Sequence, residues 1–173
     1  IRHYNLGRHI LLVGHKNHPE VIGTMGQVPS EFVSLIETVE DAKNISVKNT
    51  EKLAYATQTT LSIDDTQEIL TVLKKRFPSI KGPNSEDICY ATTNRQQAVK
   101  SMAKLCDTIL VIGAENSSNS LRLVEVALSH GVKKAQLIPD EYRLDQFLEG
   151  FNPSITPNLG LTAGASAPET LVQ

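Results

Sequence analysis

The 173-residue sequence predicts an α/β protein made of two similar lobes, each a small parallel sheet flanked by helices. Short apolar runs, typical of strands buried on both faces, alternate with segments of helical periodicity along the chain. The clearest of these runs lie at 9–14 and 108–113. The same plan starts again after Gly82 and Pro83, which predicts a first lobe at 1–83 and a second lobe at 84–173.

The first lobe contains three expected strands and four expected helices. The strands lie at 9–14, 31–36 and 52–57. The helices lie at 2–8, 19–27, 39–44 and 62–77. In the last helix, Ser62 is the expected cap, Ile69, Leu73 and Phe77 share one apolar stripe, and Pro78 ends the helix. Such a strand and helix alternation favours a parallel sheet.

The second lobe repeats this order. Its expected strands lie at 108–113, 135–138 and 159–162. A capping-box pattern at Thr93 predicts a helix to residue 105, and a helix at 141–149 is also expected. Between them, a helix is expected to bury Leu121, Val124 and Leu128 on one face. Ser166 forms a last capping-box pattern with Glu169, at the start of a further helix.

Composition and charge exclude several classes of protein. The 40% hydrophobic content suits a packed core, and no apolar run approaches the length of a membrane span. A net charge of −2 without a basic stripe argues against nucleic-acid binding. Two distant cysteines, Cys89 and Cys106, do not form a disulfide framework and predict a reducing, cytoplasmic setting. Because residue 1 is Ile and a helical pattern begins near the end, we expect a part of a longer protein.

Unusual sets of polar side chains occur at five junctions before helices. They surround His18, Thr59, Asn94, Ser118 and Ser166. One helix cap needs one side chain, whereas the segment at 117–119 supplies three. Because ligands of parallel sheets bind beyond the carboxyl ends of the strands, these loops predict a site for a ligand rich in acceptors, such as a diphosphate.

Each of these residues also has a plainer interpretation. Cys89 is either a metal ligand or a small residue at a strand end, and Cys106 lies on an apolar helical stripe. Glu20 is either a proton donor or an acid favoured in a first helical turn. Arg95 is expected to pair with a surface acid. The residues alone therefore predict a protein that binds a phosphorylated small molecule, with enzyme and binding module both open.

Five motifs in order resemble the LytB/IspH family of 4-hydroxy-3-methylbut-2-enyl diphosphate reductases. The motifs are GHKNHPEV with GTMGQ (14–27), TQTTLS (57–62), DICYATTNRQ (87–96), NSSNS (116–120) and TAGASAP (162–168). The resemblance covers nearly the whole chain. It implies a fold of three α/β lobes around a 4Fe–4S cluster, of which this chain resembles the second and third lobes.

The resemblance also implies a reaction and its partners. The family removes an allylic hydroxyl from its substrate by reductive dehydration and gives isopentenyl and dimethylallyl diphosphates. Its electrons come from a ferredoxin or flavodoxin, and neither nucleic acid nor a membrane is implied as a partner. Cys89 matches one of three cysteine ligands of the cluster, whereas Cys106 matches none. The other two cysteines are expected upstream of Ile1.

Roles for individual residues follow from the same resemblance. Glu20 resembles the acid that delivers protons, and Thr59 resembles the hydroxyl that relays them. The residues that resemble the substrate-binding set are His18, Thr60, Asn94, Ser117, Ser118, Asn119 and Ser166. The alternative is that the chain is a cluster-free diphosphate-binding module or an inactive fragment.

Overall fold

The computed structural model describes residues 1–83, 88–154, 158–168 and 170. The contacts within the chain divide it into two compact units, Ile1–Cys89 and Tyr90–Gln173. The predicted boundary at residue 83 adjoins residues that lie outside the described ranges, and it stays a prediction. Each unit contains one parallel sheet of three strands flanked by helices, so the predicted fold class is confirmed.

In the first unit, the strand order is β2-β1-β3. The strands are β1 (His9–Val13), β2 (Val33–Ile36) and β3 (Leu53–Thr57). Val13 pairs with both Ile36 and Thr57, so all three strands end at one edge of the sheet. Because β1 lies at the centre, the loops after β1 and β3 begin side by side, and these loops carry two of the predicted motifs.

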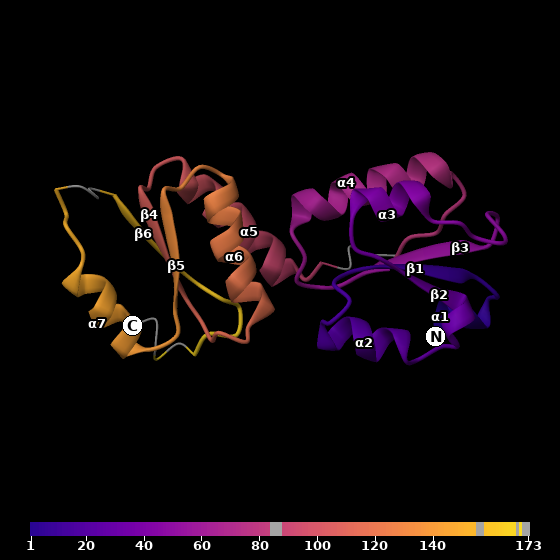
Figure 1. Cartoon of the computed structure of the whole chain (residues 1–173), viewed down its shortest axis with the longest axis horizontal. Helices are drawn as coiled ribbons and strands as arrows, with labels where there is room; N and C mark the ends of the chain where they lie inside the picture. The colour runs from indigo at the N-terminus through magenta and orange to yellow at the C-terminus, as the bar shows by residue number, and fades with distance from the viewer. Residues whose placement is uncertain (84–87, 155–157, 169, 171–173) are drawn as a thin grey trace. The chain divides into compact units, whose positions relative to one another are not determined.

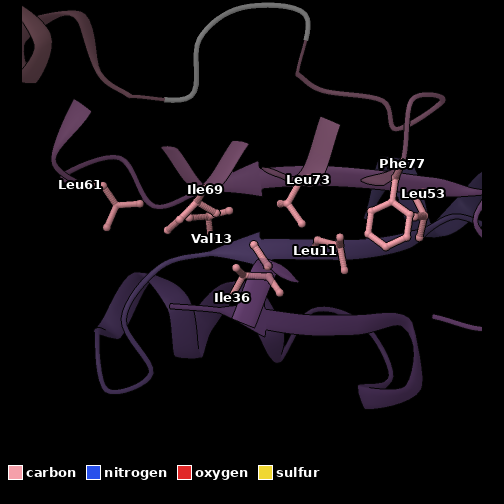
Figure 2. Packing of buried hydrophobic residues seen from close by; sticks show 9 residues of the cluster. Leu11, Val13, Ile36, Leu53, Leu61, Ile69, Leu73 and Phe77 are labelled. Atoms are coloured by element: carbon pink, nitrogen blue, oxygen red, sulfur yellow. The ribbon is translucent and has the colours of Figure 1, made fainter. Parts of the chain in front are cut away.

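Helices cover both faces of this sheet (Figure 1). They are α1 (Arg2–Asn5), α2 (Pro19–Met25), α3 (Val39–Asn44) and α4 (Ile63–Arg76), with a 3-10 turn η1 (Ser30–Phe32). On the face covered by α3 and α4, Leu11 and Val13 pack against Ile69 and Leu73 (Figure 2). Burying each of these side chains contributes roughly 1.5–3 kcal/mol. On the other face, Val21 of α2 packs in a smaller cluster.

The second unit repeats this topology with its own first strand at the centre. Its order is β5-β4-β6, and the strands are β4 (Thr108–Ile112), β5 (Lys134–Ile138) and β6 (Leu159–Ala163). The helices are α5 (Tyr90–Ala103), α6 (Ser118–Ser129) and α7 (Glu141–Glu149). Ile109 and Val111 pack with residues of α5 and α6, whereas Leu110 packs with Phe147 of α7. The prediction of two similar lobes is therefore confirmed at the level of topology.

Two predictions about the second unit's helices are wrong. Helix α5 begins at Tyr90, so Thr93 lies inside the helix and does not cap it. Thr92 and Gln96, one turn apart, are buried, and their packing stabilises the turn ahead of Thr93. In α6, Leu121 and Leu128 are 43% and 48% exposed. The buried face is the one that carries Ser120, Leu123, Val126 and Ala127.

Smaller differences concern the ends of elements. The strand expected at 31–36 begins at Val33, because Ser30–Phe32 forms the 3-10 turn. Phe77 follows α4 as its C-cap but is buried in the cluster of Ile69 and Leu73, as the predicted stripe requires. The predicted capping box of Ser166 and Glu169 lies outside the described residues. Within the described ranges, no helix has the length and apolar character that crossing a membrane requires.

A capping box that the sequence interpretation missed begins α3. Thr38 Oγ1 accepts a hydrogen bond from Asp41 N at 3.0 Å, and Asp41 Oδ2 accepts from Thr38 N at 2.9 Å. The same carboxylate accepts from Glu37 N at 3.0 Å. These hydrogen bonds favour the charged form and lower the pKa of Asp41. The box fixes the start of α3 and the chain's exit from β2.

Candidate functional site

Glu20 and Thr59 form a hydrogen-bonded pair at the carboxyl edge of the first sheet. Glu20 lies in the first turn of α2, after β1, and Thr59 lies in the loop after β3. Thr59 Oγ1 donates to Glu20 Oε2 at 2.9 Å. Thr59 N donates to Glu20 Oε1 at 3.0 Å and to Oε2 at 3.2 Å. While the hydroxyl donates to the carboxylate, its oxygen can still accept a hydrogen bond from a ligand. A carboxyl group and a hydroxyl at this distance are able to exchange a proton.

His18 caps the helix that carries Glu20. Its backbone is extended, with φ −76° and ψ 133°, and Pro19 occupies the first helical position. Glu20 N donates to His18 Nδ1 at 3.2 Å. Because Nδ1 accepts this hydrogen bond, a neutral ring carries its proton on Nε2. His18 therefore has a structural role as the cap of α2.

Gln58 is a buried amide that the sequence interpretation did not select. It is 2% exposed and lies between the loops after β1 and β3. Gln58 Oε1 accepts from His15 N at 3.1 Å, and Nε2 donates to Thr60 Oγ1 at 3.0 Å. A Cβ at Gly14 would lie 3.2 Å from this side chain and 2.6 Å from Val21 Cγ2. Gln58 thus joins the two loops beside the Glu20–Thr59 pair, and the adjacent glycine was the available sequence signal.

A small cavity opens next to the pair. Its volume is about 160 Å³, and Glu20, Thr24, Thr57 and Thr59 supply its polar lining. Leu12, Val21 and Ala56 are among its apolar walls. A half-enclosed cavity with a carboxylate and hydroxyl groups on one side can hold a polar group of a ligand against the pair.

Cys89 lies close to the loop after β3, which carries Thr59. Its backbone N–H bonds to Thr59 O at 3.4 Å, and its side chain is an exposed free thiol. An iron–sulfur cluster is held by several cysteine thiolates. The described ranges contain no group of three or more His, Cys, Asp or Glu side chains able to hold a metal ion. The residues described in this chain therefore do not make a complete ligand set for a cluster, and Cys89 supplies one thiolate at most.

A second polar group lies at the carboxyl edge of the other sheet. Ser117 caps α6, and its Oγ accepts from Ser120 N at 3.3 Å and from Ser120 Oγ at 3.0 Å. Ser166, in the loop after β6, lies with its Oγ 3.4 Å from Ser117 Oγ. Asn119 is only 7% exposed, and neither of its amide atoms has a hydrogen-bond partner among the described residues. Buried amides normally have partners, so this one is suited to a ligand.

Ser118 and Asn94, the other residues predicted for this end of the substrate, differ in exposure. Ser118 is half-buried in the first turn of α6, and Asn94 is exposed on α5. Arg95 does not follow its expected pairing with a surface acid, because its Nε donates to Ala163 O at 2.9 Å. That hydrogen bond ties α5 to the end of β6, just before the loop of Ser166. Ser120, which the sequence interpretation also passed over, is fully buried beneath Ser117.

These features define an α/β protein whose two parallel sheets end in polar loops. One loop region carries the Glu20–Thr59 pair, and the other carries a serine group formed by Ser117, Ser120 and Ser166. The chain belongs to the LytB family, because the family model described as LytB protein matches residues 1–173.

Curated relatives and a solved structure agree with this family. The chain is 58% identical over 172 residues to 4-hydroxy-3-methylbut-2-enyl diphosphate reductase of Hyphomonas neptunium, covering 99% of this chain and 53% of that protein. It is 57% identical to reductase 2 of Rhodopseudomonas palustris, covering 99% and 52%. A solved structure, the E-1-hydroxy-2-methyl-but-2-enyl-4-diphosphate reductase from Plasmodium falciparum, matches with a TM-score of 0.87 at 37% identity, covering 98% of this chain and 52% of that one. The chain thus spans about half the length of these relatives.

Proposed function

We propose that this chain supplies part of the active site of a reductase that removes the allylic hydroxyl of 4-hydroxy-3-methylbut-2-enyl diphosphate. The observation that carries the proposal is the Glu20–Thr59 pair, in which a hydroxyl and a backbone N–H hold one carboxylate. The relatives named as this reductase support the choice of substrate. Isopentenyl and dimethylallyl diphosphates are the proposed products.

In this proposal, the pair acts on the hydroxyl end of the substrate. Hydroxide is a poor leaving group, and protonation lets the oxygen leave as water. Thr59 Oγ1 lies 2.9 Å from the carboxyl group. It takes the proton that Glu20 holds and releases its own hydroxyl proton to the substrate oxygen. Thr60 lies in the same loop as Thr59, and its hydroxyl accepts a hydrogen bond from Gln58 Nε2.

The diphosphate end is assigned to the serine group and to His18. Ser117, Asn119 and Ser166 are the proposed donors. Ser118, Asn94 and His18 are further proposed contacts of the diphosphate. Binding energy from these remote contacts orients the reacting end of the substrate, which is how non-reacting groups contribute to rate.

A 4Fe–4S cluster is the proposed source of electrons at the site, with Cys89 as one of its ligands. The cluster would supply the two electrons of the reduction, received from a ferredoxin or flavodoxin. The described residues do not complete its ligand set. We place the protein in the cytoplasm, in keeping with its free cysteines.

The test is turnover of the reductase that contains this chain, with Glu20→Gln compared against Glu68→Gln, an exposed acid on α4. Glu20→Gln should lower kcat by about 10²-fold or more, within the range that general acid catalysis contributes, with KM nearly unchanged. Glu68→Gln should keep native turnover. Native kcat in Glu20→Gln would remove the residue from the proposed relay.

A second candidate function is a cluster-free diphosphate-binding module. The incomplete set of metal ligands among the described residues favours it for this chain alone. Anaerobic reconstitution of the longer protein that contains this chain, followed by iron and sulfide analysis, separates the two. Stoichiometric iron and sulfide that depend on Cys89 support the reductase assignment, whereas diphosphate binding without iron supports the module.

A further inference from the structure

Ser120 is a polar residue packed where two strand ends approach a helix. It is 0% exposed and lies in the first turn of α6. A Cβ on Gly113, after β4, would lie 2.2 Å from Ser120 Oγ, and a Cβ on Gly164, after β6, would lie 2.0 Å from it. Only glycine at both positions leaves room for this hydroxyl. The fold therefore places one buried hydroxyl at the edge where β4, β6 and α6 meet.

The hydrogen bonds of Ser120 determine what its neighbour can do. Ser120 N and Ser120 Oγ both donate to Ser117 Oγ, at 3.3 Å and 3.0 Å. A hydroxyl oxygen has two lone pairs, so both acceptor positions of Ser117 are filled. The remaining capacity of Ser117 is its own O–H. Its acceptor in the described part of the chain is Ser166 Oγ at 3.4 Å, a long distance for two hydroxyl groups.

We propose that Ser120 is a positioning residue that holds the Ser117 hydroxyl as an outward hydrogen-bond donor, so that Ser117 contacts only ligand atoms that accept a hydrogen bond. The inference rests on the proposed function, and it adds the reason for the ligand's chemical class. Ser117 cannot accept a hydrogen bond from a ligand. When no ligand is present, the Ser117 hydroxyl donates to Ser166 Oγ. An anion with several acceptor oxygens, such as a diphosphate, satisfies both hydroxyls at once.

Two other features of the same edge support an anion. Asn119 follows in the helix with a buried amide that has no partner among the described residues, so its Nδ2 is a further donor. The start of α6, a helix of 12 residues, adds the positive end of the helix dipole. Both features favour an anion next to Ser117.

The experiment is calorimetric titration of the 173-residue chain with inorganic pyrophosphate. The variants are Ser120→Ala, Ser117→Ala, the double variant, and Ser129→Ala as a control that removes a hydroxyl from the far end of α6. Ser120→Ala should weaken pyrophosphate binding by roughly threefold to tenfold, the size of one net hydrogen bond. The double variant should bind within about twofold of Ser117→Ala, because Ser120 acts through Ser117. Ser129→Ala should bind like the native chain.

The outcomes separate this inference from the proposed function. Native affinity in Ser120→Ala, or losses that multiply in the double variant, would overturn the positioning role while Ser117 keeps its place in the site. No pyrophosphate binding by the native chain would overturn the proposed serine site and the inference with it. A measurement without variants is NMR of the native chain with pyrophosphate bound. The Ser117 hydroxyl proton should show a coupling to phosphorus, and its observation without that coupling would count against a donor.

Discussion

Thr59 holds the carboxylate of Glu20 through its backbone N–H and its hydroxyl together, although the two residues are 39 positions apart in the sequence. The backbone contact fixes where the carboxylate lies, and the hydroxyl contact connects it to the adjoining cavity. The positioning role of the backbone contact and the chemical role of the hydroxyl can be tested separately, because a substitution can remove the hydroxyl and keep the backbone N–H.

Replacing Thr59 with Val removes the hydroxyl and keeps the backbone contact and the branched shape. We expect turnover of the reductase that contains this chain to fall by about 10²-fold, because the relay to Glu20 is broken. Thr71→Val, which removes a hydroxyl from exposed α4, is the matched control. Steady-state kinetics measures both, and an unchanged kcat in Thr59→Val would mean that Thr59 only positions the carboxylate.

Replacing Gln58 with Leu should destabilise the first unit. The change removes the hydrogen bonds that Gln58 makes with His15 N and Thr60 Oγ1, and each such hydrogen bond contributes about 0.5–1.5 kcal/mol. Urea denaturation followed by circular dichroism should therefore show a loss of about 2 kcal/mol or more. Gln67→Leu, at an exposed position of α4, should change stability by less than about 0.5 kcal/mol. Equal effects in both variants would contradict a linking role for Gln58.

Replacing Gly164 with Ala should be strongly destabilising, because the new Cβ would lie 2.0 Å from Ser120 Oγ. Overpacking of this kind costs about 1–3 kcal/mol. Gly150→Ala is the control, because a Cβ at Gly150 would have Phe147 O as its nearest neighbour, at 3.9 Å. Thermal unfolding should show a clear drop in Tm for Gly164→Ala only.

The same contact allows a test by compensation. Adding Ser120→Ala to Gly164→Ala removes the oxygen that causes the clash, and the closest remaining side-chain atom, Ser120 Cβ, is at 3.2 Å. The double variant should therefore unfold at a higher temperature than Gly164→Ala alone. A Tm at or below that of the single variant would show that the clash with Ser120 Oγ does not cause the destabilisation by Gly164→Ala.

His9 should make folding stability depend on pH. Burial lowers the pKa of His9 below its ordinary value of 6.5, against a weaker opposite effect of a hydrogen bond with the backbone of Glu31. The unfolded chain therefore binds a proton more readily than the folded one. Stability from this residue is fully present above about pH 6.5 and is lost as the pH falls below it.

Comparison of the native chain with His9→Gln isolates this effect from the other histidines. The native chain should lose more stability than His9→Gln when the pH is lowered from about 7.5 to 5.5, as measured by urea denaturation. Ser34, whose Oγ lies 2.8 Å from His9 Nε2, remains in both proteins. Parallel pH profiles for the two proteins would assign the dependence to other groups.

Much of the fold was predictable because it depends on local sequence patterns, namely apolar runs and helix caps. The central strands β1 and β4 are continuous apolar runs, and His18 and Ser117 precede helices that they do cap. Predictions failed where packing between distant segments outweighs the local signal. Thr93 matches a helix-cap pattern, yet α5 begins three residues earlier, at Tyr90, because Thr92 and Gln96 are buried.

The sequence by itself determined the parallel α/β plan, the polar loops and the residue types at each site, because periodicity and capping act over a few neighbouring residues. Only the tertiary structure decided which of these residues meet. It brings Thr59 to Glu20, inserts Gln58 between two loops, and turns α6 so that Ser120 is buried against Gly113 and Gly164. Such pairings depend on how strands align and which helix face packs inward, and no short stretch of sequence contains that information.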